Sequence, residues 1–200
     1  MKEALREALR RFPGLSPYVA AAKSGTEYDQ GRFIVSFFGR RFQVTYPQGE
    51  VQEVGFSSPL PLWLQVTTLH YLITADGAQM ADQWIAFRDL PGGHILLSNF
   101  EMNTLAPLTA ALGNDPEGFR RAAQALDGYP MGLGDASFRF LAFPRLPMAC
   151  ILWTGEEGLP PAVNIVYDGG APHYLHTEDL SAVAEYLSQA LRHGPRLDKA

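Results

Sequence analysis

The sequence is almost without cysteine: Cys150 is the only one in 200 residues. A lone cysteine excludes a disulfide within the chain, and it excludes an iron–sulfur or zinc site built from the chain's own cysteines. No apolar run approaches the roughly 20 residues that cross a bilayer, and Lys2, Glu3 and Arg6 interrupt any apolar signal core at the N-terminus. These absences predict a cytoplasmic protein with no membrane partner.

Charged residues are few, and acidic residues slightly outnumber basic ones. Charged residues make up 18% of the sequence, hydrophobic residues make up 46%, and the formal net charge is −5. An acidic balance disfavours nucleic acid as a partner, while the composition is typical of a globular protein that buries about 70% of its unfolded surface. We therefore expect one domain over residues 1–200, with a helical segment at 1–24 and a frayed tail at 195–200.

Three apolar runs near the C-terminus predict the centre of a β-sheet. They span residues 137–143, 148–153 and 162–167, and the short connections between them are punctuated by proline or glycine, which favours antiparallel neighbours. The middle run predicts the central strand, in which Cys150 would be buried and unreactive. A long terminal helix follows, with Thr177 as its predicted N-cap.

Two hairpins and three further helices are predicted between the N-terminal helical segment and this meander. The hairpins pair residues 32–38 with 42–46 and residues 84–88 with 94–98. The helices cover residues 58–76, 105–112 and 116–126, and the last two begin at the predicted caps Thr104 and Asp115. The fold class is therefore α+β: a mainly antiparallel sheet of six or seven strands, built from hairpins and a C-terminal three-stranded meander, with helices packed on its faces.

A candidate binding site lies where the last strand ends and the terminal helix begins. Asp168 ends an apolar strand, Gly169 and Gly170 permit close approach of a ligand to the backbone, and the helix N-terminus offers free N–H groups. Tyr167 and Tyr174 add surfaces on which a flat ligand could stack. A simple strand-to-helix turn is the alternative interpretation. The candidate ligand-binding residues are Asp168, Tyr167, His173, Tyr174, Glu178 and Asp135.

Asp135 follows a glycine-rich turn, Gly132-Leu133-Gly134. A phosphate-binding loop needs a helix N-terminus after it, whereas a strand is predicted here. The turn therefore predicts a strand entry in which Asp135 accepts hydrogen bonds from local backbone N–H groups.

His173 and His176 form a His-x-x-His pair, which could direct two imidazoles at one metal ion, with nearby carboxylates completing the site. Glu178 and Asp179 also suit the first turn of a helix, where the dipole favours negative charge. His70, within an apolar helix, is interpreted as a core histidine. No nucleophile motif of the type G-x-S-x-G is present.

Three functions stay open. The leading hypothesis is a non-catalytic domain that binds a small ligand or a protein partner. The second is a metal-dependent or carboxylate-based enzyme that uses the region of Asp168, His173, His176 and Glu178. The third is a structural subunit without a ligand. The sequence identifies neither a cofactor nor an oligomeric state.

Five short signatures occur in order along the chain. They are LHYL from Leu69, FRDLPGG from Phe87, GDAS from Gly134, PRLPMACILW from Pro144 and VYDGGAPHYLHTEDL from Val166. Together they resemble the bacterial domain of unknown function numbered 3786, over about residues 22–191. The resemblance implies a soluble, uncharacterised bacterial protein. Some members of that family carry a cysteine-rich iron–sulfur segment, which this sequence lacks, and the family's acidic G-D-E-E-F stretch reads GEEGL here, from Gly155 to Leu159.

Overall fold

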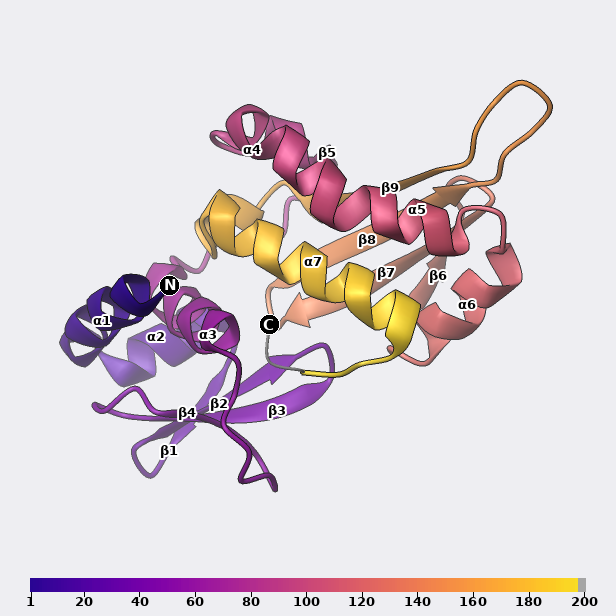
Figure 1. The fold of residues 1–200 in the computed structure, drawn as a ribbon. Coiled ribbons are helices and arrows are strands. Elements are labelled where there is room, and N and C mark those ends of the chain that lie inside the picture. The colour runs from indigo at the N-terminus through magenta and orange to yellow at the C-terminus, as the bar shows by residue number, and fades with distance from the viewer. Residues whose placement is uncertain (198–200) are drawn as a thin grey trace.

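The computed structural model describes residues 1–197 and is built on two antiparallel β-sheets (Figure 1). The first sheet has the order β1-β2-β3-β4, with bounds Glu27–Asp29, Arg32–Phe37, Arg40–Thr45 and Val51–Glu53. Its two longer strands form the first predicted hairpin, and their alternate residues are buried on one face. Residues 198–200, the end of the tail expected to be frayed, lie outside the described residues.

The second sheet has five strands in the order β5-β9-β8-β7-β6. Their bounds are Trp84–Ala86 (β5), Tyr129–Met131 (β6), Ala136–Phe143 (β7), Leu146–Trp153 (β8) and Ala162–Asp168 (β9). The predicted three-stranded meander is confirmed, and β8 is its central strand. There are two sheets where one of six or seven strands was expected. The two sheets meet at the end of β2, where the N–H of Phe38 donates to the carbonyl of Ala142, 3.0 Å away, without a continuous ladder.

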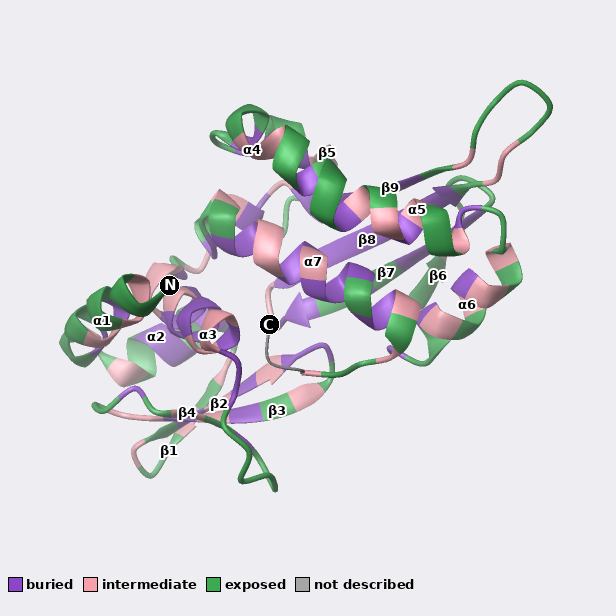
Figure 2. Ribbon diagram, in the orientation of Figure 1, coloured by how far each residue is buried: buried purple, intermediate pink, exposed green. Residues whose placement is uncertain are grey.

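The helices divide between the two sheets (Figure 1). Helices α1 (Lys2–Arg11), α2 (Pro17–Ser24) and α3 (Leu62–Thr74) lie beside the first sheet. Helices α4 (Gly93–Phe100), α5 (Ala106–Leu112), α6 (Pro116–Gln124) and α7 (Thr177–His193) lie on one side of the second. The predicted apolar stripe of α7, from Leu180 to Leu191, is buried against that sheet (Figure 2). Among residues 1–197, no helix combines the length and the apolar character needed to cross a bilayer.

The second predicted hairpin is wrong. Residues 94–98 belong to α4, and β5 pairs with β9 instead, with Trp84 opposite Asp168. A short apolar run fits a strand or a buried helix equally well, so periodicity does not separate them. The tertiary packing decides in favour of a helix, because the rings of Phe87 and Phe100 stack with their centroids 3.9 Å apart and hold the helix against the end of β5.

The predicted helix caps have different outcomes. Asp115 caps α6 by accepting a hydrogen bond of 2.7 Å from the N–H of Gly118. Thr104 does not begin a helix, since it lies in a π-helical turn, Glu101–Leu105, that joins α4 to α5. Thr177 is the first residue of α7 rather than its cap, and its hydroxyl donates to the carbonyl of Pro91 at 2.6 Å.

Cys150 is expected to be unreactive in the folded protein. Its side chain is 0% exposed, it lies between Phe138 of β7 and Ile165 of β9, and burial raises the pKa of the thiol. A disulfide reagent such as dithionitrobenzoate should therefore label the native protein slowly and label the denatured protein at once. Fast stoichiometric labelling of the folded protein would contradict the burial of Cys150 in the core.

Candidate functional site

Two hollows lie near the end of β9, on opposite sides of the second sheet. Successive residues of a strand point to opposite faces, so Tyr167 and Asp168 cannot line the same pocket. Tyr167 points toward the helices, where its hydroxyl donates to the carbonyl of Leu180 at 3.1 Å. Asp168 faces the other side, together with Trp84 and Arg139. The single pocket expected at this point is therefore divided in two by the sheet.

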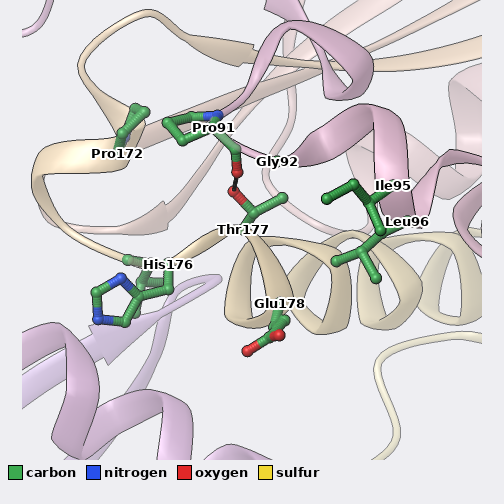
Figure 3. A pocket seen from close by; sticks show the side chains of 9 residues that line it. Pro91, Gly92, Ile95, Leu96, Pro172, His176, Thr177 and Glu178 are labelled. Carbon is green, nitrogen blue, oxygen red and sulfur yellow. Dashed lines mark hydrogen bonds between the residues drawn. The ribbon is translucent and has the colours of Figure 1, made fainter.

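The hollow on the helix side, here called the helix-start groove, lies between the start of α4 and the start of α7 (Figure 3). Its volume is about 410 Å³. The hydrogen bond from Thr177 to Pro91 ties its two walls together. Ile95 is 75% exposed on the α4 wall, so the described chain leaves much of this apolar surface open. The principal lining residues are Pro91, Ile95, Leu96, Pro172, His176 and Glu178.

Polar groups enter this groove from the first turn of α7. No side chain among the described residues caps the helix N-terminus, so its first N–H groups have no side-chain acceptor. Glu178 is the one carboxylate among the residues that line the groove, and His176 is the one imidazole (Figure 3). The groove therefore combines a mostly apolar lining with one carboxylate acceptor at the uncapped start of α7.

A second pair of polar groups lies beside the groove, between α3 and α7. Nδ1 of His70 is 2.8 Å from Oδ2 of Asp179, and the ring centroids of His70 and His176 are 6.3 Å apart. The buried carboxylate fixes the orientation of the imidazole, because it accepts the ring N–H. His70 was interpreted as a core histidine, and its partner lies 109 residues away, so no local sequence pattern connects the two.

His173 lies apart from His176 and pairs with a different residue. Its Nδ1 is 2.6 Å from Oδ2 of Asp76, and this hydrogen bond, with that from the N–H of Ala78, holds the pKa of the Asp76 carboxyl below its usual value. Within residues 1–197, no group of three or more histidine, cysteine, aspartate or glutamate side chains is placed to hold a metal ion. The structure does not bring the side chains of the predicted metal site together.

The two candidate tyrosines are part of the core. Tyr167 and Tyr174 are both fully buried, and the hydroxyl of Tyr174 donates to the carbonyl of Ala78. Burial raises the pKa of the Tyr167 phenol, so this group stays a neutral hydrogen-bond donor. Neither ring leaves an exposed face on which a ligand could stack.

Asp168 organises the segment that precedes β5. Its carboxylate is 4% exposed and accepts three backbone hydrogen bonds, from the N–H groups of Ala81 (2.8 Å), Asp82 (2.9 Å) and Gly170 (2.8 Å). A carboxylate has lone pairs for all three donors. Asp168 therefore fixes the path of the chain between α3 and β5. The same residue also lines the hollow on the open side of the sheet.

Asp135 lies at the opposite end of the second sheet. It immediately precedes β7, whose first residue pairs with Leu152, while Asp168 is at the far end of β9. Its carboxylate accepts hydrogen bonds from the N–H (2.7 Å) and hydroxyl (2.8 Å) of Thr154, which lower the pKa of the acid. Asp135 does accept a hydrogen bond from a backbone N–H, but the donor is Thr154, 19 residues along the chain, and not the local turn that was predicted. The residue borders neither hollow.

The fold and these two hollows define an α+β protein with helices on one side of its larger sheet and an open second side. The model of one family, described as a domain of unknown function (DUF3786), matches residues 16–190. The chain belongs to this family, as the five short signatures indicated. No curated protein and no solved structure matches the chain.

Proposed function

We propose that this protein is a non-catalytic binding domain and that the helix-start groove receives a small, largely apolar molecule with a cationic group. The observation that carries this proposal is the composition of the groove. Its volume of about 410 Å³ lies within the usual range for small-molecule sites, and its lining is largely apolar, with Glu178 as its one carboxylate. A ligand with an apolar body and an ammonium group matches that arrangement.

The hydroxyl and thiol chemistry of the chain supports binding over catalysis. Thr177 is the only hydroxyl residue that lines the groove, and its hydroxyl already donates to Pro91. The only thiol, that of Cys150, is buried in the core. A nucleophile would need to be free and activated by a neighbouring base, and these two groups are neither.

Three probes with the same six-carbon chain and different charge test the proposal. Hexylamine, hexanol and hexanoate are titrated into ¹⁵N-labelled protein, and the amide shifts are mapped onto the structure. Hexylamine is expected to bind most tightly and hexanoate most weakly, with the largest shifts at Leu96, Leu175 and Glu178. Shifts that cluster elsewhere, or hexanoate binding as tightly as hexylamine, would contradict the proposal.

Glu178→Gln removes the charge and keeps the shape. It should weaken hexylamine binding about threefold to fivefold, since Glu178 is exposed and solvent screens its charge, and leave hexanol binding unchanged. Glu185→Gln, on the same helix and outside the groove, is the matched control and should change the binding of neither hexylamine nor hexanol.

Ile95→Asp should abolish binding of hexanol without affecting folding, because Ile95 is exposed on the groove wall. Unaltered hexanol binding in that variant would exclude this groove as the site.

A further inference from the structure

The side of the second sheet opposite the helices carries a second hollow. Helices α4 to α7 all lie on the other side (Figure 1). On the open side Ala149, Ile151 and Val166 form a small buried cluster, with Trp84 and Met131 packed against it. A hollow of about 370 Å³, here called the sheet-face hollow, lies over this side, between the segment that leads into β5 and the edge strand β6.

Aromatic side chains border the sheet-face hollow at both of its edges. Trp84 stands on β5 and Tyr129 stands on β6, which are the two edge strands of the sheet. The guanidinium of Arg139, on β7, lies 5.8 Å from the centroid of the Tyr129 ring. Met80 and Met131 add adaptable apolar surface. The Tyr129 ring already has the Arg139 guanidinium over one face, which leaves the indole of Trp84 to attract a second cation.

Two exposed side chains of opposite charge, Arg139 and Asp82, line the same hollow without an ion-pair partner in the described part of the chain. Arg139 forms no ion pair with any of residues 1–197, and the same holds for Asp82. The two residues lie on different sides of the hollow, because β8 and β9 separate β7 from β5. An exposed arginine and an exposed aspartate that both face one hollow, yet do not meet, leave room for a ligand between them.

Asp82 is held in position by the rest of the fold. Its backbone is left-handed, with φ +52°, a conformation that is uncommon for residues other than glycine. Its N–H donates to Oδ2 of the buried Asp168 at 2.9 Å. The carboxylate of Asp168 therefore maintains the turn that places the Asp82 side chain at the edge of the hollow.

We infer that the sheet-face hollow binds a small zwitterion, with the ligand carboxylate on Arg139 and the cationic nitrogen near Trp84 and Asp82. Arginine recognises a carboxylate through parallel N–H donors, and a carboxylate beside an indole face attracts an ammonium group. A ligand with only a negative charge would leave Asp82 uncompensated, and one with only a positive charge would leave Arg139 uncompensated. Free amino acids and N-methylated betaines share this chemistry.

Titration with glycine betaine, glycine, tetramethylammonium and acetate tests the inference. The indole N–H signal of Trp84, one of three tryptophans, reports on the hollow in ¹⁵N-labelled protein. At least one of the two zwitterions is expected to shift this signal and to bind tenfold or more tightly than tetramethylammonium or acetate. Tighter binding of betaine would identify an N-methylated ligand, and tighter binding of glycine a free amino acid. No shift with either zwitterion would overturn the inference, as would equal binding of tetramethylammonium.

Charge-neutral variants assign the two ends of the ligand. Arg139→Gln and Asp82→Asn should each weaken binding of the zwitterion about tenfold, because each removes one charged partner. Both side chains are exposed, so both variants should fold. Arg121→Gln and Asp29→Asn, exposed elsewhere, are the matched controls and should leave binding unchanged. Unchanged affinity in Arg139→Gln would overturn the inference.

The two proposed sites can fail separately. Glu178→Gln should leave zwitterion binding at the sheet-face hollow unchanged, since the sheet separates that hollow from the helix-start groove. Conversely, Arg139→Gln should leave hexylamine binding unchanged. An Arg139→Gln variant that lost hexylamine binding would place both ligands in one site and contradict this assignment.

Discussion

Replacement of Met148 by aspartate is expected to prevent folding. Met148 is 0% exposed in β8, on the side that faces the helices, between Phe140 of β7 and Tyr167 of β9. A carboxylate there has no partner, and burying it should remove several kcal/mol from a total stability of about 5–15 kcal/mol. Urea unfolding followed by circular dichroism should show no cooperative transition. A transition at the wild-type midpoint would contradict the central position of β8.

Ile151→Asp is the matched control for this change. Ile151 lies in the same strand, three residues on, but it is on the open side of the sheet and is 6% exposed. No helix covers this side of the sheet (Figure 1), so the new carboxylate lies closer to water than at position 148, and we expect a variant that still unfolds cooperatively and loses less stability than Met148→Asp. The sequence does not separate the two positions, because both belong to one continuous apolar run. Only the structure distinguishes position 148 from position 151, because it shows which side of the sheet the helices cover.

The elements that could be predicted are those whose pattern is long and consistent. The β8 run is apolar at every position, and α7 repeats apolar residues at helical spacing over four turns, so each pattern fits one structure. Residues 94–98 are too few to show a period, and they form a helix because Phe100 stacks on Phe87. The division into two sheets is likewise a tertiary property, set where Phe38 meets Ala142.

The candidate site was predictable only in part, for the same reason. The strand-to-helix junction indicated a site near His176 and Glu178, and both residues line the helix-start groove. The α4 wall of that groove was missed because its residues were predicted to be a strand. The pairing of His70 with Asp179 joins residues far apart in sequence, and no spacing rule could have indicated it. Asp168 was predicted to bind a ligand because it ends an apolar strand, but alternation along β9 turns it away from the groove.

Asp168→Ala is expected to release the segment between α3 and β5. Three backbone N–H groups lose their acceptor, two of them in that segment at Ala81 and Asp82. Hydrogen bonds to a buried charged group contribute more than neutral ones, so we expect the free energy of unfolding to fall by about 3–5 kcal/mol. Hydrogen exchange should show the amides of Ala81, Asp82 and Gly170 losing protection well before the strands of the second sheet.

Two variants separate this role of Asp168 from the contacts that surround it. Asp168→Asn keeps one acceptor oxygen and should lose about half as much stability as Asp168→Ala. Asp76→Ala breaks the half-exposed pair with His173 and the exposed hydrogen bond from the N–H of Ala78, at the other end of the same segment, and should lower stability by only about 1 kcal/mol. If Asp168→Ala kept the wild-type stability and the protection of all three amides, its carboxylate would not be what holds this segment. The position of Asp82, and with it one end of the zwitterion site, would then need another explanation.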